Sequence, residues 1–175
     1  MKRREIIKLA ALSAGALLAP GSVTSLAASS NAHPGPGATP AQETLLAELV
    51  EVIIPTTDTP GAKAAGVEKF IVRLLRDCHQ PEEQARFYKG LADLEADALK
   101  TFALPFLQLS TAQRTELLKL CSVRDKAFFL KLKQLTVTGY FTSEIGATQA
   151  LVYLPIPGRF EGSTPMAPGQ RAWAL

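Results

Sequence analysis

The feature that most constrains the fold is a helical spacing of apolar residues that recurs from residue 41 to residue 152. Apolar side chains return three and four positions apart in successive stretches, as expected for helices that bury one face. Proline and glycine separate these stretches, and no segment with strand periodicity and no internal repeat stands out. The pattern predicts an all-α fold, an irregular bundle of about five to six helices over residues 41–152.

Start and stop signals divide this helical domain. Pro55 ends the first helix, Pro81 suits the first turn of the third, and Ser110 with Gln113 has the spacing of a capping box. Between the first two helices, residues 56–61 predict a loop, with Pro60-Gly61 placed for a type II turn. The expected buried positions of the third helix are Phe87, Leu91, Leu94 and Ala98. The last long helix is expected over residues 123–138 with Gly139 as its end, and a short helix over residues 143–151.

Residues 1–27 have the organisation of an export signal peptide: a basic start, an apolar stretch and then small residues. The apolar stretch of about 13 residues is shorter than the roughly 20 that span a bilayer. Cleavage is expected after Ala27 or one or two residues later. The twin-arginine pattern consists of Arg3, Arg4, Ile6, Ile7 and Lys8. That route exports folded proteins, which typically hold a cofactor or accompany a partner that does; a general secretory signal is the alternative.

Two segments flank the helical domain. Residues 28–40, rich in Ala, Ser, Pro and Gly, predict a flexible linker. Residues 153–175, rich in Pro and Gly, predict an extended C-terminal tail. Tyr153, Phe160 and Trp173 are spaced along this tail, which is therefore expected to dock either onto the chain's own helices or onto a partner.

The charged and reactive residues argue against several classes of function. The formal net charge of +3 comes from residues 1–27, which hold four basic and one acidic side chain, so no basic surface for nucleic acid is expected. The two histidines, His33 and His79, do not provide a nucleophile–base pair or a three-ligand metal site. No phosphate-binding glycine motif and no haem c attachment motif is present. The chain is therefore predicted to be non-catalytic and to bind no cofactor or metal.

The two cysteines leave several alternatives open. Cys78 and Cys121 both fall beside apolar residues of expected helices, which favours two buried thiols. Because an exported protein meets an oxidising compartment, a Cys78–Cys121 disulfide and a bridge to another chain are the other possibilities.

Two segments resemble a known family. Residues 53–67 read IIPTTDTPGAKAAGV, and residues 139–146 read GYFTSEIG, followed by Tyr153 and Pro157-Gly158. They resemble the signature segments of the gluconate 2-dehydrogenase subunit 3 family, and the resemblance extends over roughly residues 42–173. A twin-arginine leader is also usual in that family.

The resemblance implies a small accessory subunit of a periplasmic dehydrogenase complex that acts on CH–OH groups of sugars or sugar acids. The FAD would belong to a large subunit of the glucose–methanol–choline oxidoreductase type, and haem c to a cytochrome subunit. The small subunit would support maturation, twin-arginine export and stability of the flavoprotein. Its contact with the membrane would be indirect, through the complex. No catalytic residue transfers to this chain.

The residues expected to contact the partner lie in the two signature segments and the tail. They are Pro55, Asp58, Pro60, Gly61, Gly139, Tyr140, Phe141, Tyr153, Phe160 and Trp173. For Tyr140 and Phe141, packing inside the chain's own core is the alternative.

Two other functions remain as alternatives. The first is a free-standing periplasmic module that binds a small ligand in a pocket among Phe128, Phe129, Leu132 and Tyr140. The second is an enzyme in its own right that uses Asp58 or Glu144 as a general base.

Overall fold

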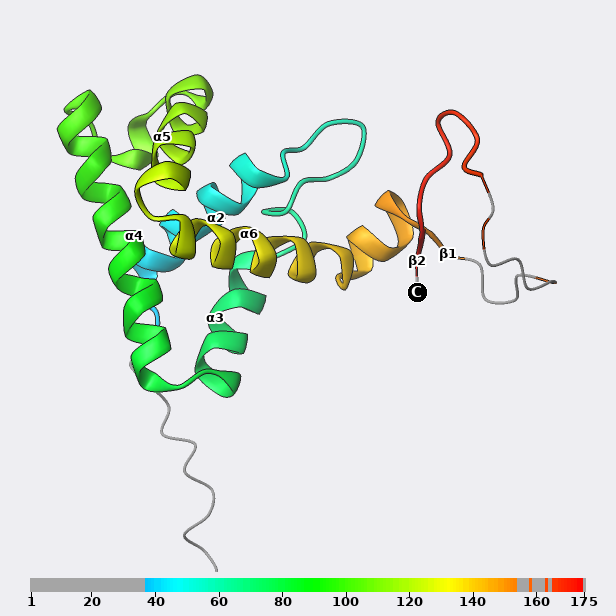
Figure 1. Ribbon diagram of the computed structural model, residues 1–175, viewed down its shortest axis with the longest axis horizontal. Coiled ribbons are helices and arrows are strands. Elements are labelled where there is room, and N and C mark those ends of the chain that lie inside the picture. Colours follow the sequence, from blue (N-terminus) through cyan, green and yellow to red (C-terminus); the bar gives the residue numbers. More distant parts are fainter. Residues whose placement is uncertain (1–36, 154–157, 159–162, 164, 175) are drawn as a thin grey trace, which may run out of the picture. The chain divides into compact units, whose positions relative to one another are not determined.

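The computed structural model describes residues 37–153, 158, 163 and 165–174 (Figure 1). The α-helices are α2 (Pro40–Ile53), α3 (Val67–Cys78), α4 (Pro81–Phe102), α5 (Thr111–Arg124) and α6 (Lys126–Phe141). A 3₁₀ turn, η2 (Phe106–Gln108), precedes α5, and a π-helical turn, η3 (Gly146–Ala150), follows α6. Two short strands are β1 (Val152–Tyr153) and β2 (Trp173–Ala174). The expected all-α class is confirmed.

Local sequence signals explain where the helices begin. Ser110 and Gln113 form the predicted capping box: the Gln113 amide donates to Ser110 Oγ at 3.4 Å, and the Ser110 amide donates to Gln113 Oε1 at 2.9 Å. Thr39 and Gln42 form a second capping box, not predicted from the sequence, at the start of α2. Pro81 occupies the first turn of α4, as expected.

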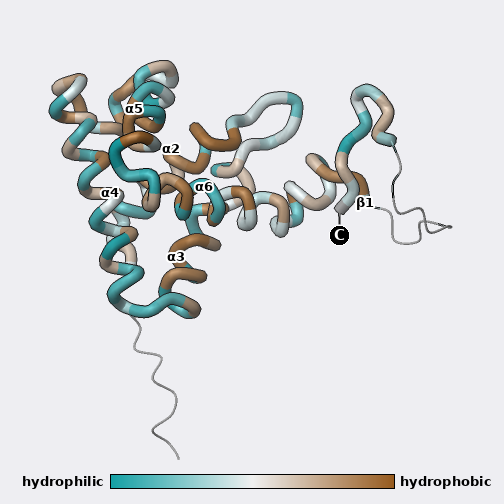
Figure 2. The backbone as a smooth tube through the Cα atoms, viewed as in Figure 1, coloured by the Kyte–Doolittle hydropathy of each residue, from teal (hydrophilic) through white to brown (hydrophobic). Residues whose placement is uncertain are grey.

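The core forms around α2, which contacts α3, α4, α5, α6 and η2. Three α2 side chains, Leu46, Leu49 and Val50, are completely buried. The predicted face of α4 is buried as expected, while hydrophilic residues alternate with hydrophobic ones along that helix (Figure 2). Burial of these apolar side chains is the main contribution that stabilises a bundle of short helices.

Gly139 does not end α6, contrary to the prediction. The helix continues to Phe141, and a Cβ atom at Gly139 would lie 2.6 Å from Phe70 Cδ1 of α3. Gly139 therefore allows α3 and α6 to approach closely rather than terminating the helix. The predicted type II turn at Pro60-Gly61 is also wrong, because the described glycines with positive φ are Gly66, Gly158 and Gly169.

The C-terminal tail includes two short strands, which were not predicted from the sequence. β1 pairs in parallel with β2, so that Val152 faces Trp173, and the Val152 amide donates to Ala172 O at 2.9 Å. A turn at Pro168-Gly169 is closed by the Gln170 amide, 3.0 Å from Ala167 O. Two-residue strands are too short to produce a recognisable periodicity.

The cysteines differ from the expected pair of buried thiols. Cys121 is buried, Cys78 is exposed, and both thiols are free. Within the part of the chain that the structure describes, no helix is both long enough and apolar enough to cross a membrane.

Candidate partner-docking surface

The loop between α2 and α3, residues 54–66, is organised by one carboxylate. Glu51 Oε1 accepts hydrogen bonds from the Thr56 amide at 2.9 Å and the Thr56 hydroxyl at 2.7 Å. Glu51 Oε2 accepts from the Lys63 amide at 3.0 Å. Because hydrogen bonds to a carboxylate are stronger than those between neutral groups, Glu51 holds Thr56, near the start of the loop, and Lys63, near its end.

The backbone at Gly61 passes close to this carboxylate. A Cβ atom at Gly61 would lie 2.5 Å from Glu51 Oε1 and 2.6 Å from the Thr56 nitrogen. The Gly61 amide also donates to Thr56 Oγ1 at 3.0 Å. Glycine is needed at this position because only a residue without a side chain leaves room for Glu51.

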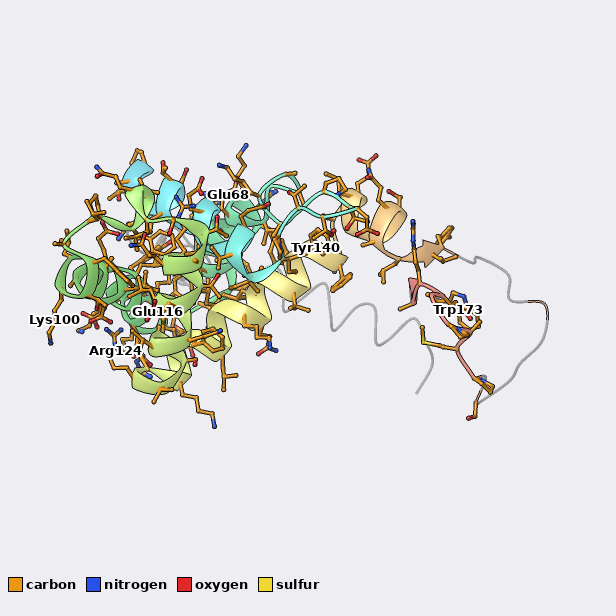
Figure 3. All side chains as sticks on the ribbon, turned by 90° about the horizontal axis from the view of Figure 1, so that it is seen from above. Glu68, Lys100, Glu116, Arg124, Tyr140 and Trp173 are labelled. Carbon is orange, nitrogen blue, oxygen red and sulfur yellow. The ribbon has the colours of Figure 1, made fainter. Side chains whose placement is uncertain are left out.

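Tyr140 connects the loop to α6. Its side chain, labelled in Figure 3, is only 2% exposed. Its hydroxyl donates to Pro60 O at 2.7 Å. Two residues from the separate signature segments, Pro60 and Tyr140, are thus brought into direct contact. The Tyr140 ring therefore packs inside the molecule, the second of the two alternatives considered for it, and holds the loop in place.

A charge network attaches the same loop to α5. Glu48 pairs with Lys63 Nζ at 2.5 Å and with the Arg114 guanidinium of α5. The hydrogen bond from Lys63, followed by that from Arg114, lowers the pKa of the Glu48 carboxyl despite its burial. Arg114 also donates to Leu107 O at 2.8 Å and lies over the Phe106 ring. The loop is therefore fixed from α2, α5 and α6.

The outer edge of the loop is open to solvent. Pro55, Thr56, Thr57 and Asp58 are exposed. A hydrogen bond from the Thr57 hydroxyl, 2.9 Å away, and bonds from neighbouring backbone amides lower the pKa of the Asp58 carboxyl. A general base is most effective when its pKa lies near the working pH, so the lowered pKa makes Asp58 a weaker base than an ordinary carboxylate.

The other expected contact residues differ in how far they are exposed. Phe141, at the end of α6, is 39% exposed, with its ring centroid 5.2 Å from that of Tyr140. Tyr153 and Trp173, on the two paired strands, are 68% and 50% exposed. Phe160 lies outside the described residues. Gly139 is buried between α6 and α3 and presents no side chain outward.

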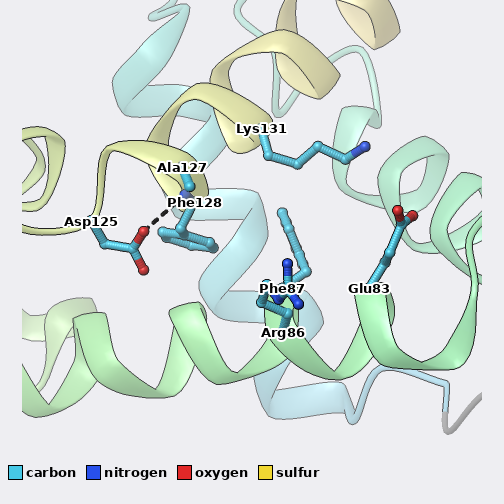
Figure 4. Close-up of a pocket in the computed structure, with 7 residues that line it drawn as sticks. All are labelled: Glu83, Arg86, Phe87, Asp125, Ala127, Phe128 and Lys131. Carbon is cyan, nitrogen blue, oxygen red and sulfur yellow. Dashed lines mark hydrogen bonds between the residues drawn. The ribbon is translucent and has the colours of Figure 1, made fainter.

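A groove of about 240 Å³ lies between α4 and the start of α6 (Figure 4). Phe87 and Phe128 form its apolar floor, and Arg86, Lys131, Glu83 and Asp125 border it. Of the residues predicted to line a ligand pocket, Phe128 contributes to this groove, whereas Leu132 and Tyr140 are buried in the core. Asp125 already accepts a hydrogen bond from the Phe128 amide at 3.0 Å, and Glu83 lies 2.5 Å from His79 Nδ1.

Sequence reasoning missed the residues that organise the loop, Glu48, Glu51 and Arg114. A signal for the two glutamates was present, because they stand among the apolar positions of α2 just before the loop. Nothing in the sequence connects Arg114 to Glu48, which lies 66 positions earlier. Among the described residues, no group of three or more His, Cys, Asp or Glu side chains is placed to hold a metal ion.

These features define a small helical protein whose signature loop is held rigidly by its own helices while its outer edge faces solvent. The family model for gluconate 2-dehydrogenase subunit 3 matches residues 40–158, well over half of the chain. The chain therefore belongs to the gluconate 2-dehydrogenase subunit 3 family. Neither a curated protein nor a solved structure gives a significant match.

Proposed function

We propose that this chain is the non-catalytic accessory subunit of a periplasmic, flavin-dependent sugar or sugar-acid dehydrogenase. The partner is a large subunit of the glucose–methanol–choline oxidoreductase type, which holds the FAD. A c-type cytochrome subunit accepts the electrons, and any attachment to the membrane is through the complex. The small chain supports maturation, export and stability of the flavoprotein.

The observation that supports this proposal most directly is membership of a family named for a dehydrogenase subunit. The twin-arginine pattern at Arg3 and Arg4 adds a second line of support, because that export route accepts folded, cofactor-loaded passengers. A rigid loop with an exposed edge is the kind of surface that binds a partner without large rearrangement.

Capture of the partner from its native compartment tests the proposal. The full-length chain with a C-terminal tag is purified from periplasm, and the bound material is analysed by mass and by visible absorbance. The expected result is a stoichiometric larger protein with a flavin spectrum that bleaches when the correct sugar is added. A colourless monomer from cells that express the neighbouring genes contradicts the proposal and favours the small-ligand module.

The export role has its own test. Replacing the arginine pair by lysines (Arg3→Lys with Arg4→Lys) keeps the charge but removes the twin-arginine pattern. If the flavoprotein lacks its own export signal, both proteins are expected to remain in the cytoplasm. Arrival of the flavoprotein in the periplasm without this chain contradicts co-export, although the two could still assemble there.

A further inference from the structure

Helix α6 carries large apolar residues on two opposite sides. Its inward side buries Phe128, Leu132 and Leu135 in the core. A second apolar row, the outer row of α6, consists of Leu130, Val137 and Phe141, which are 50%, 37% and 39% exposed. At about 100° per residue these three positions fall on one strip, centred opposite the buried side.

A surface helix normally has polar residues opposite its core side, and a helix that is apolar all round is normally buried. The outward positions of α4 follow the usual rule, with Glu82, Arg86 and Lys89 exposed. The outer row of α6 departs from it because three exposed apolar residues stand in one strip. Such an alignment, rather than single exposed leucines such as those on α4 and α5, is typical of a surface that another molecule covers.

The charges beside the outer row indicate what kind of molecule covers it. Lys126 and Lys133 border the row on one side, and α6 contains no acidic residue. Lys131 lies on the other side, where it also lines the groove that Glu83 and Asp125 border. None of the ion pairs in the described part of the chain includes these lysines. A second copy of this chain is disfavoured, because a two-fold contact through α6 would bring the lysines of both copies together. A partner with carboxylates around an apolar strip fits.

The outer row continues along the chain into other exposed apolar residues. α6 contacts η3, and η3 contacts β1. Parallel strands are normally covered on both faces, yet the paired β1 and β2 leave Tyr153 and Trp173 largely exposed. These strands therefore present a second apolar area that is uncovered in the isolated chain.

We propose that the outer row of α6 is the main docking site for the flavoprotein subunit, which contacts it through an apolar strip bordered by Asp and Glu side chains. The chemistry of the partner surface follows from α6 alone, whereas the identity of the partner rests on the function proposed above. Leu130 and Val137 provide the buried centre of this contact, and the three lysines provide its charged rim.

Paired substitutions of exposed apolar residues test this site. The full-length chain is co-expressed with the flavoprotein, and capture is measured for the wild type, Leu130→Glu and Val137→Glu. The matched controls are Leu99→Glu on α4 and Leu120→Glu on α5, whose wild-type leucines are 50% and 49% exposed. Circular dichroism and thermal unfolding verify that every variant is folded.

Leu130→Glu and Val137→Glu are expected to weaken capture by a factor on the order of ten or more, since each places a charge in a desolvated contact. The two controls are expected to capture as the wild type does. A double variant that combines Lys131→Glu with Lys133→Glu is expected to bind the flavoprotein more weakly than the wild type. Its binding is also expected to depend less on salt concentration.

The outcomes separate the two proposals. If the wild type captures no flavoprotein, the proposed function fails. If it captures the flavoprotein and Leu130→Glu and Val137→Glu do so equally well, the α6 site is wrong while the proposed function stands. Equal weakening by Leu120→Glu also overturns the α6 site. The α6 site is also wrong if the chain alone forms a dimer that Leu130→Glu dissociates. It is likewise wrong if the chain binds anionic lipid vesicles and Leu130→Glu abolishes that binding but leaves capture of the flavoprotein unchanged.

Discussion

At the scale of single residues, Tyr140 has two structural roles, one for its ring and one for its hydroxyl. Its ring fills the core, and its hydroxyl reaches Pro60 O across 80 residues of sequence. The hydroxyl therefore determines where the signature loop lies relative to α6, and the ring determines how α6 packs.

Tyr140→Phe is predicted to lower the free energy of unfolding by about 1 kcal/mol, because it removes one hydrogen bond and leaves Pro60 O without its donor. Urea denaturation measures the change. Tyr153→Phe is the matched control, because the Tyr153 side chain is largely exposed, and it is expected to have no effect. Equal unfolding free energies for wild type and Tyr140→Phe would show that water replaces the hydroxyl without cost.

The two cysteines are predicted to differ sharply in reactivity. Burial, with a smaller effect of Asp125, raises the pKa of the Cys121 thiol to about 11, so very little thiolate forms at neutral pH. Iodoacetamide is expected to label Cys78 alone in the folded chain and both cysteines in urea, as read by peptide mass analysis. Cys78→Ser should remove labelling of the folded chain. Rapid labelling of Cys121 without denaturant would contradict its burial.

At the scale of the elements, Glu48 joins α2, the loop and α5 through Lys63 and Arg114. Its pKa is lowered in the folded chain, so its contribution to stability is complete above the unfolded value near 4.5. That contribution is lost as the pH falls below 4.5 and through the lower folded value.

Glu48→Gln is predicted to reduce the free energy of unfolding by about 1 to 3 kcal/mol at neutral pH, because Arg114 is left partly buried without its charge partner. The difference from the wild type should shrink as the pH is lowered through this range, which thermal unfolding at a series of pH values measures. Asp77→Asn, at an exposed ion pair, serves as the control and is expected to change stability much less. A difference that does not vary with pH would contradict the network.

Most elements were predictable because their signals are local. The capping box at Ser110, Pro81 in the first turn of α4 and the apolar spacing of α4 each depend on residues within a few positions of one another. Gly139 shows where local reasoning fails. A glycine near a helix end usually indicates that the helix stops there. At Gly139, however, Phe70 of α3 occupies the space that a side chain would need.

At the scale of the whole molecule, the helical domain and the C-terminal tail are predicted to differ in their contribution to stability. The described tail is connected to η3 and β1 by few bonds, such as the one from Arg171 Nη1 to Gln149 O at 2.7 Å. A chain that ends at Tyr153 is expected to keep its helical content, with a melting temperature lowered by less than about 4 °C.

Circular dichroism and thermal unfolding measure this truncation. A chain that ends at Glu144 is the control, because it also removes Gly146, whose position against Tyr140 leaves no room for a side chain. The shorter chain is expected to lose clearly more stability. Loss of cooperative unfolding on removal of residues 154–175 would show instead that the tail is part of the core.

The candidate surface was only partly predictable. The two signature segments and the exposed aromatics of the tail were identified from their residues, and the structure places Pro60 against Tyr140. The outer row of α6 was missed apart from Phe141. Leu130 and Val137 resemble core residues in a sequence, and only the position of the neighbouring helices shows which side of α6 remains uncovered.

The sequence by itself determined the helical class, the starts of α4 and α5 and the family, because these depend on spacing and motifs within short segments. The tertiary structure alone decided the role of Glu51, the pairing of Glu48 with Arg114 and which apolar residues remain exposed. The physical reason is that close packing and charge pairing join residues that lie far apart in the chain. A local sequence pattern does not predict which distant residue will pack beside a given side chain.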